Sequence, residues 1–159
     1  MRLERCRIAS SGCGVSSWLT VAGYRKRISL TDLFQARPLN LSIVDDDEDV
    51  RTALRRMLRS MGHRVSVFAS AEEYEAAPPG ADCLILDLRL PRLNGLELRE
   101  RIRKRGSSVP IVFITGDAGL STGGPEAHLG APALAKPFDD NELIAAITRA
   151  MSANHESTE

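Results

Sequence analysis

The sequence has few cysteines, few lysines and no long hydrophobic run, and each of these scarcities excludes a class of protein. Its three cysteines are an odd number without Cys-x-x-Cys spacing, which argues against a disulfide framework or a zinc site. Free thiols suit a reducing compartment, so we expect a cytoplasmic protein. No stretch reaches the roughly 18 consecutive apolar residues of a membrane-spanning helix, so we expect no membrane association.

Basic residues are mostly arginine and are unevenly placed. Lysine and arginine number 21 and are balanced by 21 acidic residues, so the net charge does not point to nucleic acid or a membrane surface. Residues 1–38 hold seven basic residues against two acids, a net of +5, which leaves −5 on the rest of the neutral chain. Only three basic residues are lysines, namely Lys26, Lys104 and Lys136, so a lysine at a special position stands out.

The 159 residues suit a single domain preceded by an extension. A regular rhythm begins at Leu39, directly after Pro38. We predict an N-terminal extension over 1–38, one domain over 39–153 and a tail over 154–159. The extension shows no clear hydrophobic period, and three interpretations stay open. It is a disordered segment, it contains a short helix near Ile28–Phe34, or it is translated from a start codon placed too early, which we prefer. Ser and Gly interrupt its apolar stretch too often for a signal peptide.

Short apolar runs alternate with helical patterns from Leu39 onward. The runs cover 39–44, 64–69, 81–90, 109–116 and 131–137, and the helical patterns cover 50–61, 70–77, 95–105 and 139–151. This alternation predicts βαβ units, in which helices cover both faces of a parallel sheet. Within 95–105 we expect Leu96, Ile102 and the stem of Arg99 to face the core. The glycine-rich stretch 116–131 is a poor helix where the rhythm calls for one.

Polar side chains stand at the ends of four of the five apolar runs. Asp45 and Asp46 follow the first run, and Asp87, Thr115 and Lys136 lie near the ends of three later ones. Because the carboxyl ends of parallel strands share one edge of the sheet, we expect these side chains to converge. Clustered carboxylates suit Mg²⁺, which would neutralise acids that otherwise repel one another. Asp87 is then a candidate nucleophile on phosphorus, with Mg²⁺, Lys136 and the Thr115 hydroxyl neutralising phosphoryl oxygens.

Simpler interpretations of the same residues stay open. Asp47, Glu48 and Asp49 suit the first turn of a helix, where they interact favourably with its dipole. Asp45 and Asp46 could do no more than cap that helix. Thr115 could be an ordinary β-branched strand residue. The basic cluster at 99–105 is better explained as a solvated helix face than as a nucleic-acid patch, and we expect no direct DNA binding.

Four motifs occur in order over residues 39 to about 151: IVDDDEDVRTALRRMLRSMG, LILDLRLPRLNGLEL, PIVFITG and AKPF. In order and spacing they resemble the receiver domains of response regulators in two-component signalling, above all the receivers that are fused to LuxR-type DNA-binding domains. The resemblance implies an α/β, flavodoxin-like, doubly wound fold. Its five-stranded parallel sheet would have the strand order 2-1-3-4-5, with helices on both faces.

The resemblance also implies roles for individual residues. Asp87 would accept a phosphoryl group from a sensor histidine kinase or a histidine phosphotransfer protein. Asp46 would bind the cofactor Mg²⁺ directly, Asp45 would help through water, and the backbone carbonyl of Arg89 would be the third protein ligand beside Asp87. The resemblance further implies a cis Lys136–Pro137 bond, with Lys136 and Thr115 in the roles given above, and a loop glycine at Gly95.

The chain departs from the family pattern near the fifth apolar run. Many receivers carry an aromatic residue three positions before the conserved lysine, and here that position is Ala133. The interval from Thr115 to Lys136 is also one residue shorter than is common in the family. Because these changes fall on the surface that receivers use to signal, we expect activation by loop ordering and not by aromatic rotation.

We therefore expect a stand-alone receiver, without an output domain, that acts as a switch or relay toward an unknown downstream partner. It would be no enzyme beyond catalysing its own phosphorylation and dephosphorylation. One alternative is a phosphorylation-independent interaction module with a degenerate fourth helix. Another is an enzyme of the haloacid-dehalogenase type, which also uses an Asp nucleophile and Mg²⁺, but that family needs a second Asp where this chain has Arg89.

Overall fold

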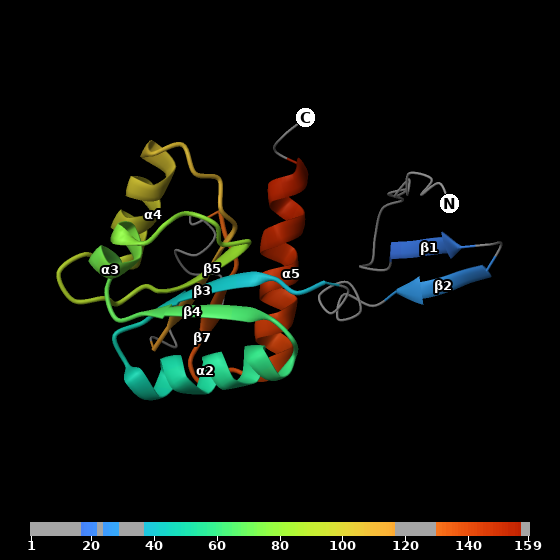
Figure 1. Cartoon of the computed structure of the whole chain (residues 1–159), viewed down its shortest axis with the longest axis horizontal. Coiled ribbons are helices and arrows are strands. Elements are labelled where there is room, and N and C mark those ends of the chain that lie inside the picture. Colours follow the sequence, from blue (N-terminus) through green and yellow to red (C-terminus); the bar gives the residue numbers. More distant parts are fainter. Residues whose placement is uncertain (1–16, 22–23, 29–36, 117–129, 157–159) are drawn as a thin grey trace.

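A five-stranded parallel sheet forms the centre of the computed structural model, which describes residues 17–21, 24–28, 37–116 and 130–156 (Figure 1). The strands are β3 (Asn40–Val44), β4 (Arg64–Phe68), β5 (Cys83–Asp87), β6 (Ile111–Thr115) and β7 (Ala133–Ala135). They lie side by side in the order β4-β3-β5-β6-β7, and every neighbouring pair is parallel. Counted along the domain this order is 2-1-3-4-5, so the predicted fold class is confirmed.

Helices cover both faces of the sheet, as predicted. They are α2 (Glu48–Ser60), α3 (Ala71–Ala76), α4 (Gly95–Lys104) and α5 (Asp140–Glu156). Figure 1 shows α2 on one side of the sheet and α3 and α4 on the other. One core cluster joins the strands to α2 and α5, and a second joins them to α3 and α4. The last helix runs to Glu156, beyond the predicted end at residue 151.

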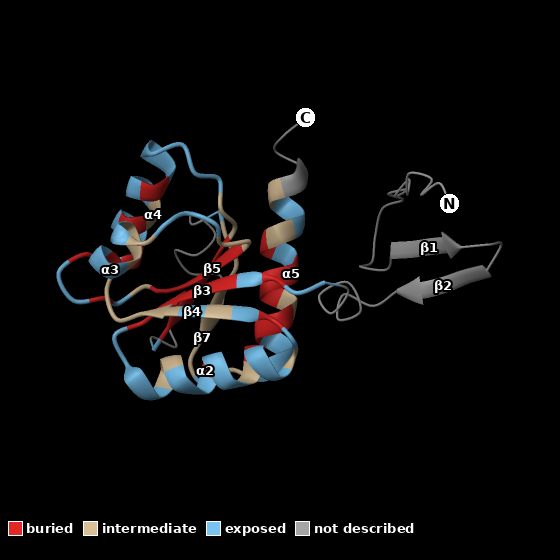
Figure 2. Cartoon of the chain, viewed as in Figure 1, coloured by how far each residue is buried: buried red, intermediate tan, exposed pale blue. Residues whose placement is uncertain are grey.

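The inner strands are buried on both faces, which explains their continuous apolar runs. Every residue of β5 and β6 is buried, whereas the edge strands β4 and β7 are only partly buried (Figure 2). Alternate residues of β5 enter different clusters: Ile85 packs in the α2/α5 layer and Leu86 in the α3/α4 layer. Burial raises the pKa of the Cys83 thiol to about 12, so this cysteine packs as a small apolar side chain.

The prediction that Leu96 of α4 faces the core is wrong. Leu96 is 36% exposed, while Leu98 and Ile102 are buried. The cause is Gly95, where an added Cβ would lie 2.4 Å from the backbone oxygen of Asp87. Because Gly95 presses against the end of β5, the residues three and seven positions later share its inward face and Leu96 is turned outward.

The N-terminal extension contains a hairpin that its hydrophobic pattern does not predict. β1 (Ser17–Val21) and β2 (Tyr24–Ile28) pair antiparallel and form a two-stranded sheet of their own. Ile28 therefore ends a strand, and the rest of the helix considered near Ile28–Phe34 lies outside the described residues. So does most of the glycine-rich stretch, from 117 to 129. Within the described ranges, no helix combines the length and apolar character needed to span a bilayer.

Candidate functional site

The predicted site residues lie at one edge of the sheet, where the parallel strands end. Asp45 directly follows β3, Asp87 ends β5, Thr115 ends β6 and Lys136 directly follows β7. Strand register brings β5 and β6 together here, because Asp87 is aligned with Ile114, the neighbour of Thr115. The alternation of strands and helices is thus enough to gather side chains that are far apart in the sequence.

Lys136 is the centre of the site's hydrogen bonding. Its Nζ donates to Asp45 Oδ2 at 2.6 Å and to Asp87 Oδ2 at 2.9 Å. The Lys136 backbone N–H donates to the Thr115 carbonyl at 2.7 Å, which ties the end of β7 to the end of β6. The Lys136–Pro137 bond is cis, as the family resemblance implies. One lysine thus bridges two carboxylates that come from different strands.

Asp45 is fully buried and held by backbone groups. Its Oδ1 accepts the Asp47 N–H at 2.9 Å, and its own N–H donates to the Phe68 carbonyl at 3.2 Å. Arg51 Nη1 donates to the Asp45 carbonyl at 2.7 Å. Arg51 is not among the predicted site residues, and only its position in α2, six residues after Asp45, could have indicated this contact.

Asp87 is also buried, with 5% of its surface exposed. Its Oδ1 accepts the Arg89 N–H at 2.8 Å, while the Gly95 N–H donates to the Leu88 carbonyl at 3.1 Å. The close approach of Gly95 to the Asp87 backbone explains the loop glycine, because any side chain would collide there. Both oxygens of Asp87 therefore have fixed partners, one from the backbone and one from Lys136.

Burial and the bridging lysine shift pKa values in the site. Burial raises the pKa of Asp45, and the hydrogen bond from Lys136 offsets only part of this rise. Burial lowers the pKa of Lys136, but its hydrogen bonds to Asp45 and Asp87 outweigh burial, and the pKa ends above its ordinary value. Lys136 is consequently a cation at neutral pH and compensates the negative charge of its partners.

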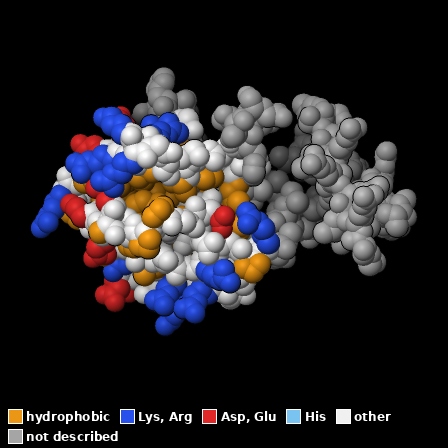
Figure 3. Space-filling view, turned by 45° about the horizontal axis from the view of Figure 1, so that its top comes forward, with side chains coloured by type: hydrophobic (Ala, Val, Ile, Leu, Met, Phe, Trp, Pro, Cys, Tyr) orange, Lys and Arg blue, Asp and Glu red, His pale blue; other side chains and the backbone are white. Residues whose placement is uncertain are grey.

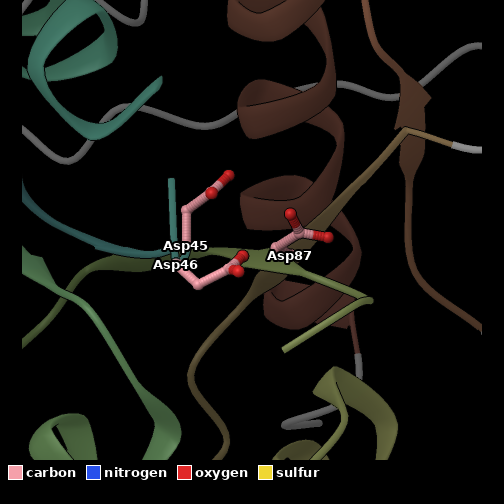
Figure 4. Close-up of side chains that lie close together, drawn as sticks. All are labelled: Asp45, Asp46 and Asp87. Carbon is pink, nitrogen blue, oxygen red and sulfur yellow. The ribbon is translucent and has the colours of Figure 1, made fainter. Parts of the chain in front are cut away.

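Three carboxylates form a group that could hold a metal ion. Asp45, Asp46 and Asp87 each offer an oxygen within 4.8 Å of the others (Figure 4). Asp46 is exposed while the other two are buried, so the group opens to solvent on the Asp46 side. A set of hard oxygen donors that keeps access to water fits Mg²⁺. The ligand role of the Arg89 carbonyl stays a prediction.

Five consecutive acids, residues 45–49, follow β3; the first two lie in the site and the last three form the start of α2. Asp47 is the N-cap of α2, and its Oδ1 accepts the N–H groups of Asp49 and Val50 at 2.9 and 3.3 Å. Glu48 and Asp49 lie in the first turn, where acids favour the helix dipole. The interpretation of these three acids as a helix start is confirmed, and Asp45 and Asp46 are left for the site.

Comparisons with known proteins place this geometry in a family. The family model for the response regulator receiver domain matches residues 41–148. The chain is 36% identical over 112 residues to response regulator protein TmoT of Ectopseudomonas mendocina, covering 69% of this chain and 51% of the relative. It is 35% identical over 115 residues to transcriptional regulatory protein FixJ of Bradyrhizobium diazoefficiens, covering 70% and 56%. The chain thus spans about half the length of these curated relatives.

Solved structures of response regulators resemble this chain as well. The response regulator StyR matches with a TM-score of 0.65 and 35% identity, over 76% of this chain and 63% of that one. A receiver domain protein from Clostridium thermocellum matches with a TM-score of 0.64 over 76% of this chain and 99% of that one; at 22% identity this likeness concerns the fold. From the matched motifs, the sheet order and the grouped aspartates, the chain belongs to the response regulator receiver domain family.

Proposed function

We propose that this chain is the phosphoacceptor of a two-component phosphorelay, modified on Asp87 in a Mg²⁺-dependent reaction. The phosphoryl donor would be a sensor histidine kinase or a histidine phosphotransfer protein. The observation that carries the proposal is the position of Lys136 Nζ, which contacts Asp87 at 2.9 Å and Asp45 at 2.6 Å beside the carboxylate group. A buried carboxylate with an adjacent fixed cation suits transfer of an anionic phosphoryl group.

In the proposed reaction an Asp87 carboxylate oxygen forms a bond to phosphorus as the phosphorus–nitrogen bond of a phosphohistidine breaks. The departing imidazole nitrogen keeps the electron pair of that bond. Asp45, Asp46 and Asp87 would hold the Mg²⁺, which supplies neutralisation of the charge on the phosphoryl oxygens. The attack needs no general base, because the nucleophile is a carboxylate oxygen and not a hydroxyl group.

Two further side chains would stabilise the transferred group. Lys136 is already within hydrogen-bonding distance of Asp87 Oδ2, so its Nζ would donate to an oxygen of the phosphoryl group once that group is attached to Asp87. Thr115 is buried at the end of β6 beside β5, where its hydroxyl would donate to a second oxygen. With Ala133 at the start of β7, we propose that the modified site is read out by loop ordering and not by rotation of an aromatic side chain.

The test is acetyl phosphate, a small phosphoryl donor, with and without Mg²⁺, followed by intact-mass measurement. The expected result is an adduct of one phosphoryl group that needs Mg²⁺, is lost in base and maps to Asp87. Asp87→Asn should abolish it, while the matched variant Asp49→Asn, in the first turn of α2, should leave it intact. A folded protein without an adduct would contradict the proposal.

The proposal does not include DNA binding. FixJ is named as a transcriptional regulator, but this chain spans 56% of its length and matches the receiver model over 41–148. A downstream protein partner of this switch or relay stays a prediction. A cytoplasmic location stays a prediction.

A further inference from the structure

A groove lies at the open edge of the sheet, and its lining does not include Asp45, Asp46 or Asp87. Its volume is about 840 Å³, and it is lined by β4 and the first residues of β3, by the loop from Ala77 to Ala81, and by residues of α2, α3 and the end of α4. β4 is the last strand in the sheet order, so among the described strands none covers its outer side. Pockets of this volume are typical of ligand sites, and an open strand edge is a template for further strand pairing.

The backbone of β4 leaves two residues turned toward this open edge. The Arg64 N–H donates to the Leu39 carbonyl at 2.8 Å, and the Phe68 carbonyl accepts from Asp45 at 3.2 Å, so the even-numbered residues face β3. Hydrogen-bonding directions alternate along a strand in a parallel pair. The N–H and C=O groups of Val65 and Val67 therefore point outward, along a groove that both residues line.

Arginines flank the groove on both faces of the sheet. Arg55 reaches it from α2 and Arg105 from just beyond α4. Glu75, the acid in the lining, is already paired with Arg105 at 3.0 Å and with Arg101 at 3.4 Å. Within the described ranges no carboxylate pairs with Arg55. Figure 3 shows hydrophobic side chains gathered between two groups of basic side chains on this side of the molecule. The net charge of the groove is positive.

We propose that the β4 edge docks an extended, acidic segment of a partner protein, which adds to the sheet as a sixth strand. The outward groups of Val65 and Val67 would supply main-chain hydrogen bonds, as in other cases of strand addition. Successive side chains of an added strand point to opposite faces, so acidic residues would meet Arg55 on one face and Arg105 on the other. The chain's own β2 is a poor occupant, because its sequence YRKRI is basic.

The first experiment measures binding of a short labelled peptide with the repeat Glu-Glu-Val-Val, which places Glu on both faces of a strand, to the full chain by fluorescence anisotropy. A peptide with the repeat Lys-Lys-Val-Val is the control. The acidic peptide should bind at least about tenfold more tightly, and its affinity should fall as salt rises because exposed charges are screened. Arg55→Glu should weaken binding about tenfold and Arg55→Gln less. Arg56→Glu, which changes an exposed arginine of α2 outside the groove lining, should not.

The second experiment follows backbone amides by hydrogen exchange. On peptide binding the Val65 and Val67 amides should become protected, while Arg64 and Ser66, which already face β3, should not change. Equal binding of the two peptides would overturn the proposal, as would equal weakening by Arg55→Glu and Arg56→Glu in folded variants. Binding without protection at Val65 and Val67 would overturn strand addition itself.

Discussion

Lys136 Nζ lies 2.6 Å from Asp45 Oδ2, although 91 residues separate the two positions along the chain. The same nitrogen contacts Asp87 at 2.9 Å, so one cation compensates two buried carboxylates from different strands. The site is therefore held together by an internal ion pair, and the two acids of that pair belong to the group that could hold a metal ion.

Replacing Lys136 with Met should lower the free energy of unfolding by about 3 kcal/mol, because losing one partner leaves buried charge uncompensated. Mg²⁺ should restore more stability in this variant than in the natural protein, since the metal then supplies the missing positive charge. Lys104→Met, which removes an exposed lysine at the end of α4, is the matched control, with an expected change within about 0.5 kcal/mol. Denaturant titration with and without Mg²⁺ measures the free energy of unfolding of the natural protein and of both variants. An equal gain in stability from Mg²⁺ in Lys136→Met and in the natural protein would contradict the expectation.

Asp46 and Asp47 are neighbours that should have separable roles. Asp46→Asn should weaken Mg²⁺ binding, measured by calorimetry, by about tenfold or more because a carboxylate ligand is lost. Asp47→Asn removes the same charge but keeps a good N-cap residue, so Mg²⁺ affinity should change little. Asp47→Ala should lower stability by about 1 kcal/mol through loss of the cap. If both asparagine variants weakened Mg²⁺ equally, general charge and not ligation would explain the effect.

His63 should make stability depend on pH in the mildly acidic range. Its Nδ1 accepts the Leu39 N–H at 3.3 Å, and burial lowers its pKa from the ordinary value of 6.5. The unfolded chain therefore takes up the proton at higher pH than the folded chain, so stability is complete above pH 6.5 and decreases as pH falls toward the lowered pKa. The amide oxygen of His63→Asn can accept the same N–H without titrating, so the thermal midpoint of this variant should change less between about pH 7 and pH 5 than that of the natural protein. The same pH dependence of the thermal midpoint in both proteins would contradict this origin.

Gly95→Ala should displace the end of β5. An added Cβ would lie 2.4 Å from the Asp87 backbone oxygen, and relieving this overlap should lower stability by about 1–3 kcal/mol. The phosphorylation rate at Asp87 should fall as well, since the carboxylate moves with its backbone. Gly116→Ala is the control for stability, because nothing lies within 4 Å of the Cβ it would add. Equal thermal midpoints for the two variants would show that the strand end tolerates the methyl group.

Much of the fold could be predicted from local patterns. The runs that became β5 and β6 are apolar throughout because both faces of an inner strand are buried. Two features could not be predicted in this way, the outward position of Leu96 and the β1–β2 hairpin, because both depend on contacts between elements. Leu96 fits a helical apolar pattern as well as Leu98 does, and only the close packing of Gly95 against the end of β5 decides which of the two leucines faces the core. The β1–β2 hairpin likewise depends on pairing between strands, which hydrophobic periodicity does not report.

The order of strands and helices along the sequence was sufficient to assign Asp45, Asp87, Thr115 and Lys136 to one edge of the sheet, because parallel strands all end on the same side. The sequence alone did not determine which atoms meet there. That Lys136 bridges Asp45 and Asp87, and that Arg51 holds the Asp45 carbonyl, was decided by the tertiary structure. Side-chain hydrogen bonds require positions within a few tenths of an ångström, and only the packing of both helical layers on the sheet sets positions so closely.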